Sequence, residues 1–242
     1  MAKLLEVDGV HKRFGGIVAT DNLSFTVEKG ESLALIGPNG AGKTTIFSLI
    51  MGEIRQQEGA IRLKGEDISR LPTHRRIQRG IARTYQVPRP FADMDVAGNI
   101  RVGMMPDSLR QMLMRGPDLE AELEVALSVG FTEADLGRTP STLSMGDLRK
   151  LELARTLATK PEIMLLDEVF AGLTVGEIAQ ISELLAKKRA EGMTFVIVSH
   201  DLRALEPLVD RATAMNFGRQ IAEGSFADVM GDAEVRAAYL GE

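Results

Sequence analysis

The segment LALIGPNGAGKTT, residues 33–45, decides the fold of this chain. It begins with a short apolar run, residues 33–36, that is typical of a fully buried strand. The next eight residues, Gly37 to Thr44, fit the pattern G-x-x-x-x-G-K-[ST] without a gap. Residues 45–50 then resemble the first turns of a helix. A glycine-rich loop between a buried strand and a helix predicts a site for the phosphates of a nucleoside triphosphate.

Backbone groups of this loop are expected to surround the phosphates. Gly40 and Gly42 leave room for N–H groups to approach anion oxygens, because a Cβ would block close approach. Lys43 is expected to reach the β- and γ-phosphates, and the Thr44 hydroxyl to bind Mg²⁺. The alternative, a glycine turn beside a surface lysine, is disfavoured by the preceding strand and the intact motif. The predicted nucleotide-contacting residues of the loop are Gly37, Pro38, Asn39, Gly40, Ala41, Gly42, Lys43, Thr44 and Thr45.

Length and composition suit a soluble α/β protein. The 242 residues are enough for a large core, and a phosphate loop of this kind implies a largely parallel sheet. The net charge of −5 argues against a general nucleic-acid binder. The chain has no cysteine, which excludes disulfides and cysteine metal sites. Residues 1–10 lack a signal peptide's apolar region and no apolar run approaches the ~20 residues of a membrane span, so a membrane role needs a partner.

The N-terminal part, up to residue 36, is expected to form β structure. Apolar or alternating runs predict strands, and glycine-containing pairs predict the turns between them. The strands are expected at residues 4–7, 23–27, 33–36 and 59–63, with turns at Asp8-Gly9, Gly15-Gly16, Lys29-Gly30 and residues 64–67.

A basic cluster surrounds a short helix that Pro72 is expected to open. Such a cluster is most often a solvated face, and it lacks the interleaved aromatic residues of a nucleic-acid surface. Its members are His74, Arg75, Arg76, Arg79 and Arg83.

Residues 100–143 are expected to be helical. Leu119, Leu123, Ala126 and Leu127 recur at helical spacing and predict a buried face. The methionines nearby favour a core filler over an adaptable docking surface, which remains the alternative. These methionines are Met104, Met105, Met112 and Met114.

Strands and helices alternate in the second half of the chain. A helix over residues 144–160 is stopped by Pro161, and a strand over 163–166 follows. Thr174 has capping-box spacing with Glu177 and should cap the next helix, which Gly192 ends. A buried strand over residues 195–198 then delivers Ser199-His200-Asp201. This order favours a parallel sheet whose carboxyl ends meet at one edge, where the phosphates should lie.

Two acids, Asp167 and Glu168, directly follow the strand over residues 163–166. In a P-loop protein the first acid normally completes the Mg²⁺ shell, and the second can orient or deprotonate the attacking water. An ordinary strand end with two solvated carboxylates is the alternative. The complete phosphate loop makes the metal and catalytic roles the better prediction.

Five further stretches lie in a characteristic order around these motifs. Residues 143–147 (LSMGD) are similar to the signature LSGGQ, Gln86 to the Q-loop glutamine and His200 to the switch histidine of one family. Residues 171–174 (AGLT) lie where the D-loop of that family belongs, and Phe14 is placed like its adenine-stacking aromatic residue. With these motifs the chain resembles the ATP-binding subunits of ABC transporters over essentially its whole length.

The resemblance implies an α/β fold. Its parts are a P-loop NTPase (RecA-like) core, an N-terminal antiparallel β subdomain and an inserted helical subdomain. The domain would be residues 1–242, with the helical subdomain at about 88–160.

The resemblance also implies roles for the site residues, with ATP and Mg²⁺ as cofactors. Thr44, Gln86 and Asp167 would hold the metal. The implied catalytic residues are Glu168, His200 and Gln86. Phe14 would stack on adenine. Gln86 could instead be a surface amide, and His200 or Phe14 a core residue.

Ser144 and Gly146 open a helix, so their hydroxyl and N–H groups can meet an anion. Within one subunit they would face away from their own phosphate loop. The family's arrangement is a head-to-tail dimer in which each signature covers the γ-phosphate held by the other subunit. A plain N-cap role for Ser144 is compatible with this arrangement.

Departures from the family pattern concern the dimer contacts more than the phosphate ligands. Asp147 replaces the signature glutamine, Val169 stands where proline is common, and Thr174-Val175 replace an Asn/Asp–Pro pair. These positions put in doubt the D-loop contacts and the turnover rate.

Within the family the chain is most similar to the branched-chain amino acid importer type. The implied partners are a second ATPase subunit, identical or not, integral membrane permease subunits and, indirectly, a solute-binding protein, with no nucleic acid. The implied location is cytoplasmic, on the inner face of the cell membrane. The similar stretches are residues 13–16, 80–86, 151–155 and 238–242.

Competing interpretations remain open at this stage. Urea, amide and aromatic-acid importers look similar, and ATPases of lipopolysaccharide export share the tail. A soluble ABC-type ATPase acting on nucleic acid or ribosomes would be expected to fuse two nucleotide domains or carry long coiled insertions. A kinase or GTPase is disfavoured because no acceptor pocket or Asn-Lys-x-Asp motif is visible.

Overall fold

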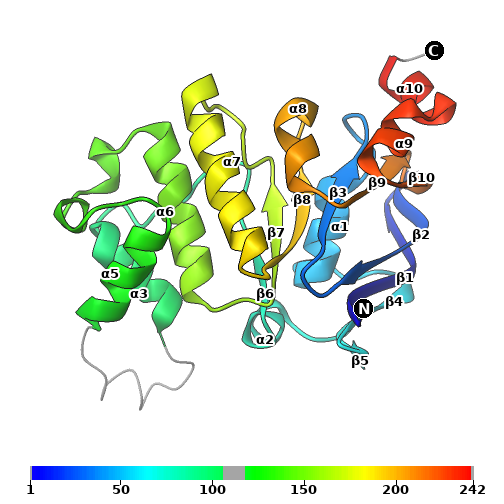
Figure 1. The fold of residues 1–242 in the computed structure, drawn as a ribbon. Helices are drawn as coiled ribbons and strands as arrows, with labels where there is room; N and C mark the ends of the chain where they lie inside the picture. The colour runs from blue at the N-terminus through cyan, green and yellow to red at the C-terminus, as the bar shows by residue number, and fades with distance from the viewer. Residues whose placement is uncertain (1, 106–117, 241–242) are drawn as a thin grey trace.

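A six-stranded sheet forms the centre of the molecule (Figure 1). The structure, a computed structural model, describes residues 2–105 and 118–240. Five neighbouring strands of this sheet are parallel, as the sequence predicted, and only β10 runs antiparallel at one edge. In spatial order the strands are β10 (Arg219–Gly224), β9 (Arg211–Asn216), β3 (Ser32–Ile36), β8 (Thr194–Val198), β7 (Ile163–Asp167) and β6 (Ile81–Arg83).

A second, antiparallel sheet of four strands comes from the N-terminal part. The predicted turn at Asp8-Gly9 is wrong, because β1 runs through it with a register shift between Val7 and Val10. Gly9 has a φ of 59°, which glycine adopts readily, so the shift is a bulge within one long strand. The spatial order is β2 (Ile17–Glu28), β1 (Lys3–Phe14), β4 (Glu58–Leu63) and β5 (Glu66–Asp67).

Helices cover both faces of the central sheet, which explains why every residue of the inner strands β3, β7 and β8 is buried. Helix α1 packs between the two sheets, where Phe47 and Leu49 share one core with Leu33 and Leu35 of β3. The alternate β3 residues, Ala34 and Ile36, face a second core on the other side. The helices are α1 (Lys43–Met51), α2 (Thr73–Gln78), α3 (Val96–Met104), α5 (Leu119–Ser128), α6 (Met145–Ala158), α7 (Val175–Ala190), α8 (Leu202–Leu205), α9 (Phe226–Gly231) and α10 (Ala233–Leu240), with 3₁₀ turns at Glu133–Asp135, Pro140–Thr142 and Glu206–Leu208.

Helices α3, α5 and α6 form a group at the side of the molecule opposite the antiparallel sheet (Figure 1). Helices α3 and α6 approach closely at Gly103, where a Cβ would lie 2.3 Å from the carbonyl oxygen of Arg155. Predicted methionines Met112 and Met114 lie outside the described residues. Met104 packs against the core, whereas Met105 is exposed.

The predicted apolar face of α5 is wrong in part. Leu119 and Leu127 are 67% and 54% exposed, whereas Glu122 and Ala126 are buried. Glu122 can face inward because the Arg101 guanidinium meets its carboxylate, with Nε 2.6 Å from Oε1. A buried acid with a bidentate partner thus lies on the inner face of α5, at a position that hydrophobic spacing did not include.

The basic cluster is not a uniformly solvated face, because Arg76 is fully buried. Its Nη1 donates to the carbonyl oxygens of Leu49 and Ile50, at 2.7 and 2.8 Å, in the last turn of α1. Burial lowers the pKa of Arg76 to about 10, so the group remains cationic at neutral pH. Arg76 therefore caps the end of the helix that the phosphate loop begins.

Replacing Arg76 by methionine should remove this cap while keeping the apolar stem. We expect a loss of roughly 2–4 kcal/mol in the free energy of unfolding, because several buried carbonyls would lose a charged donor. Urea denaturation followed by circular dichroism measures the change. Arg75→Met, at an exposed position of the same helix, is the control and should change stability little. Equal losses in the two variants would contradict the capping role.

Candidate active site

The carboxyl ends of four parallel strands meet at one edge of the central sheet. The loop after β3 carries residues 37–42, and β7 ends at Asp167. His200 lies two residues beyond β8, and Gln86 lies three residues beyond β6. The topology thus gathers the predicted site segments at one edge.

Glycines give the phosphate loop its path. Gly37 and Gly42 have φ values of 148° and 103°. A Cβ would lie 2.2 Å from the Met215 carbonyl oxygen at Gly37, and 2.3 Å from the Ala19 carbonyl oxygen at Gly42. Helix α1 begins at Lys43, and no side chain of residues 2–105 and 118–240 caps its N-terminus. Its first N–H groups can therefore serve an anion.

The Lys43 side chain folds back over the loop and is buried. Its ammonium donates to the carbonyl oxygens of Gly37 and Pro38, at 2.6 and 2.9 Å. Burial lowers the pKa of Lys43, and the charges of Glu168 and Asp167 partly oppose that effect. Among the described residues, the hydrogen bonds to this cation come from neutral carbonyls, which it can exchange for a charged acceptor.

The two acids after β7 have different surroundings. Asp167 is buried and pairs with Arg83, with 2.7 Å between Oδ2 and Nη2. Glu168 has a φ of 50°, a left-handed backbone conformation that residues other than glycine rarely adopt. Its Oε2 accepts from the His200 backbone N–H at 3.1 Å, and its Oε1 lies 3.2 Å from His200 Nε2. The geometry therefore brings Glu168 and His200 together and gives Asp167 a cationic neighbour.

Arg83 is a site residue that the sequence did not single out, beyond its place in the basic cluster. Only 4% of its side chain is exposed, so the prediction of a solvated residue is wrong. Besides Asp167, it donates to Glu53 at 2.9 Å and to Ser48 Oγ at 3.0 Å. Its guanidinium also stacks 5.1 Å from the Tyr85 ring centre. The sequence could have indicated the contact between Arg83 and Asp167 only if β6 was already known to pair in parallel with β7.

Gln86 is exposed, and its backbone is anchored by α6. The buried Arg149 donates to the carbonyl oxygens of Tyr85 and Gln86, at 2.7 and 2.9 Å. Arg149 also pairs with Glu152 at 2.6 Å, and Glu152 accepts from the Tyr85 backbone N–H. Burial raises the pKa of Glu152 despite these donors. Arg149 and Glu152 were not predicted from the sequence, and they tie the Gln86 loop to α6.

Phe14 ends β1 and lies in the hairpin that joins β1 to β2. Its ring is 47% exposed, so it is not a core residue. The Lys12 ammonium lies 5.0 Å from the ring centre. An exposed aromatic face beside a cation is a surface on which a planar ring can stack.

Ser144 is the N-cap of α6, and its Oγ accepts from the Asp147 backbone N–H at 3.1 Å. The Gly146 backbone N–H, also at the start of α6, donates a hydrogen bond to Glu177 Oε1 at 2.9 Å. Glu177 also completes the predicted capping box with Thr174 at the start of α7. In the view of Figure 1, α7 stands between α6, the helix that Ser144 caps, and α1.

One carboxylate thus joins the N-termini of two helices. The hydrogen bonds from Thr174, and then that from Gly146, lower the pKa of Glu177 to about 2. Glu177 therefore carries its charge at every ordinary pH. The capping box was visible in the sequence, whereas the contact with Gly146 spans 31 residues and was not.

A phosphate loop at the start of α1, with an acid pair and a histidine on neighbouring strand ends, defines a P-loop nucleoside triphosphatase. The family model described as ABC transporter matches residues 20–171, and that of the branched-chain amino acid ATP-binding cassette transporter matches residues 219–242. The chain therefore belongs to the ABC transporter family. It is an ATPase of that family.

Individual relatives agree with this assignment. The high-affinity branched-chain amino acid transport ATP-binding protein BraF of Pseudomonas aeruginosa is 34% identical, covering 99% of this chain and 98% of its own. The lipopolysaccharide export ATP-binding protein LptB of Haemophilus influenzae is also 34% identical, with 99% and 98% covered. A crystal structure of an ABC transporter's ATP-binding cassette in its ADP conformation superposes with a TM-score of 0.89, at 29% identity and with both chains fully covered.

Residues 2–105 and 118–240 contain no helix that could span a membrane. None of the helices there combines the length and the apolar character needed to cross a bilayer.

Acid should weaken the junction between α6 and α7 through Glu177. Its folded pKa is about 2 against a reference of 4.5, so its stabilisation is complete above pH 4.5 and is lost as the pH falls toward 2. We expect the thermal unfolding midpoint of Glu177→Gln to fall less between about pH 6 and pH 3 than that of the parent protein. Glu183→Gln, at an exposed position of the same helix, is the control and should follow the parent. Parallel curves for parent and Glu177→Gln would contradict the assignment.

Proposed function

We propose that this chain binds and hydrolyses ATP to power an ABC importer for branched-chain amino acids or related small solutes. The observation that carries the proposal is the phosphate loop beside Asp167 and Glu168, in a chain whose residues 219–242 match the branched-chain transporter model. The names of relatives such as BraF support the solute class.

ATP would bind with its phosphates against the loop of residues 37–45. Lys43 would exchange the carbonyls of Gly37 and Pro38 for β- and γ-phosphate oxygens, which are stronger acceptors because they are charged. The uncapped N-terminus of α1 would supply backbone donors. Phe14, exposed at its hairpin, would stack on the adenine ring.

The residues proposed for the metal, Thr44, Gln86 and Asp167, offer a hydroxyl, an amide and a carboxylate. These oxygen donors fit Mg²⁺, which would neutralise charge on the β- and γ-phosphates. Arg83 pairs with Asp167 and so balances its buried charge without the metal.

Glu168 would orient and deprotonate the attacking water. The His200 backbone N–H fixes one of its oxygens, and the His200 ring lies beside the other, half exposed toward the site. His200 would then contact the γ-phosphate. The positive φ of Glu168 is consistent with a residue held in an unusual conformation for function.

A second subunit, identical or not, would cover the γ-phosphate with Ser144 and Gly146 in a head-to-tail dimer. In the single chain the Gly146 N–H is bound to Glu177. A phosphate that uses this donor must displace the Glu177 carboxylate, because two anions cannot share one N–H at low cost.

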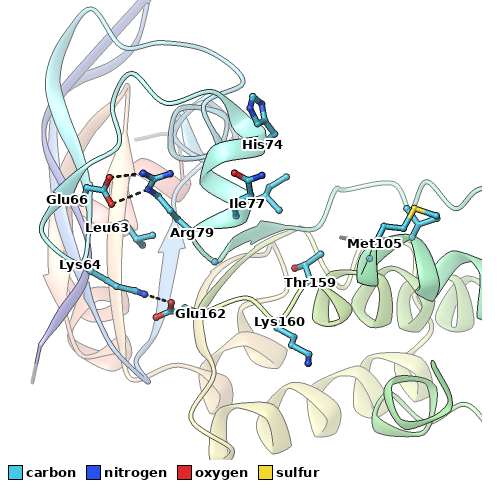
Figure 2. Close-up of a pocket in the computed structure, with 14 residues that line it drawn as sticks. Leu63, Lys64, Glu66, His74, Ile77, Arg79, Met105, Thr159, Lys160 and Glu162 are labelled. Carbon is cyan, nitrogen blue, oxygen red and sulfur yellow. Dashed lines mark hydrogen bonds and ion pairs between the residues drawn. The ribbon is translucent and has the colours of Figure 1, made fainter. Parts of the chain in front are cut away.

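Permease subunits would bind at the opposite end of the sheet. A pocket of about 660 Å³ lies there. Figure 2 shows the residues that line it, some from the side of α3 and α6 and some from the rest of the molecule. Glu162 and Gly80, at the starts of β7 and β6, lie in its wall, with Ile77 and Met105 exposed beside them. Ion pairs join Arg79 to Glu66 and Lys64 to Glu162 on one side of the pocket (Figure 2). The chain would thus lie on the cytoplasmic face of the membrane, and a solute-binding protein would act through the permease.

Lipopolysaccharide export is the alternative that one observation favours, because LptB is as similar in identity as BraF. The acidic composition gives no support to a nucleic-acid function. Transport by a complex reconstituted with its own permease subunits separates the two transport classes.

Two variants separate binding from hydrolysis in the ATP complex. Lys43→Ala should lose about ten- to hundredfold in ATP affinity, because a charge-assisted contact to the phosphates is removed. Glu168→Gln should bind ATP normally, hydrolyse it at least about 100-fold more slowly and accumulate as a dimer. Calorimetry, phosphate release and light scattering measure these effects. Wild-type turnover in Glu168→Gln, or unchanged affinity in Lys43→Ala, would contradict the proposed site.

A charge placed in the pocket should uncouple the ATPase from its membrane partner. Ile77→Asp should weaken assembly with the permease subunits and abolish leucine uptake by proteoliposomes, while nucleotide affinity stays unchanged. Arg75→Asp, at an exposed position of α2 outside the pocket wall, is a control with a larger charge change. Uptake at the parent rate in Ile77→Asp would exclude the pocket as the docking place.

A further inference from the structure

The C-terminal helix contacts the phosphate loop directly. Tyr239, near the end of α10, accepts a hydrogen bond at its hydroxyl from the Gly37 backbone N–H at 2.8 Å. The two residues are 202 positions apart in the chain. Helices α9 and α10 lie beside β9 and β10 (Figure 1). Strand β9 pairs with β3, and β10 is the edge strand beyond β9.

Gly37 is the point where the chain leaves the sheet. The last paired residue of β3 is Ile36, opposite Ala214 of β9. Gly37 is buried, so its N–H needs a partner that the ladder no longer supplies. The Tyr239 hydroxyl is that partner, and Lys43 binds the carbonyl oxygen of the same residue.

The backbone around this contact is closely packed. A Cβ at Gly37 would lie 2.2 Å from the Met215 carbonyl oxygen, so the chain is already pressed against β9 there. When Lys43 turns to phosphate it must release the Gly37 carbonyl. The hydrogen bond from the Gly37 N–H to Tyr239 then still fixes the preceding peptide, between Ile36 and Gly37.

The tail that carries Tyr239 is firmly attached. Val235 of α10 is fully buried in the core that also contains Val229 of α9. The Asp232 carboxylate accepts from the backbone N–H groups of Glu234 and Val235, at 2.8 and 3.2 Å, at the start of α10. A well-anchored helix can hold a hydroxyl in place without a large entropic cost.

We propose that Tyr239 is a positioning residue of the nucleotide site: its hydroxyl fixes the first peptide of the phosphate loop, so the C-terminal helix shapes nucleotide affinity. Residues 219–242 match the branched-chain transporter model, and the contact gives this tail a role in the ATPase itself. The proposal rests on the function proposed above. A loop held in its bound conformation loses less freedom when nucleotide binds, and so binds more tightly.

The test uses the full-length protein with Tyr239→Phe, which removes the hydroxyl and keeps the ring. In the nucleotide-free protein, hydrogen exchange of the Gly37 amide should become faster by about two- to tenfold or more. The dissociation constants of ADP and of a non-hydrolysable ATP analogue should both rise about two- to tenfold, since one neutral hydrogen bond is lost. The rate at saturating ATP should stay unchanged, so KM rises and kcat does not.

Tyr85→Phe is the matched control for exchange, because it removes a hydroxyl bond to Glu53 from the chain's only other tyrosine. Gly37 exchange should stay slow in this variant. Unchanged Gly37 exchange in Tyr239→Phe, or faster exchange with unchanged nucleotide affinity, would overturn the proposal. A fall in kcat alone would also overturn it, by placing Tyr239 in the chemical step. A parent protein that binds no nucleotide would instead refute the proposed function, while the exchange measurement would still report the contact.

Discussion

The nucleotide-binding edge depends on how the buried Lys43 ammonium is held. Two backbone carbonyls of the loop bind it, and the nearby acids stay with other partners. That arrangement requires the loop to curl back on itself. Only glycine fits at positions 37 and 42, because the backbone of Met215 leaves no space for a Cβ at the first and that of Ala19 leaves none at the second. Strands β9 and β2 therefore help to form the phosphate loop, although neither carries a residue of the motif.

Burial of the central sheet on both faces gives the site its stiffness. Helix α1 fills one side, and α6, α7 and α9 fill the other. Arg76 secures the far end of α1 by binding its last carbonyls, so the helix that begins at the phosphate loop is fixed at both ends. A close-packed protein interior is hard to compress, so a shift of one helix is passed on to the elements packed against it.

The sequence was informative wherever a local pattern decides structure. The phosphate loop, the buried strands, the caps at Ser144 and Thr174 and the parallel order were all predictable from short windows. Apart from the turn predicted at Asp8-Gly9, which is a bulge within β1, the errors share a different cause, because each depends on a partner distant in the chain. Glu122 is buried since Arg101 meets it, and Arg83 is buried since Asp167 lies one strand away. The contacts of Glu177 with Gly146 and of Tyr239 with Gly37 are likewise tertiary, and no local window contains both members. The roles of the individual site residues stay predictions.

Helix α6 has a mechanical consequence that follows from its length and its anchor. Its 14 residues form a rod of about 21 Å. Ser144 caps one end, and Thr159 and Lys160, just past the other, line the pocket at the opposite edge of the sheet. Arg149 and Glu152 clamp the rod near its middle to the loop of Gln86. A rod held at that point would pivot there, so a small tilt at the pocket would move the end capped by Ser144 in the opposite direction.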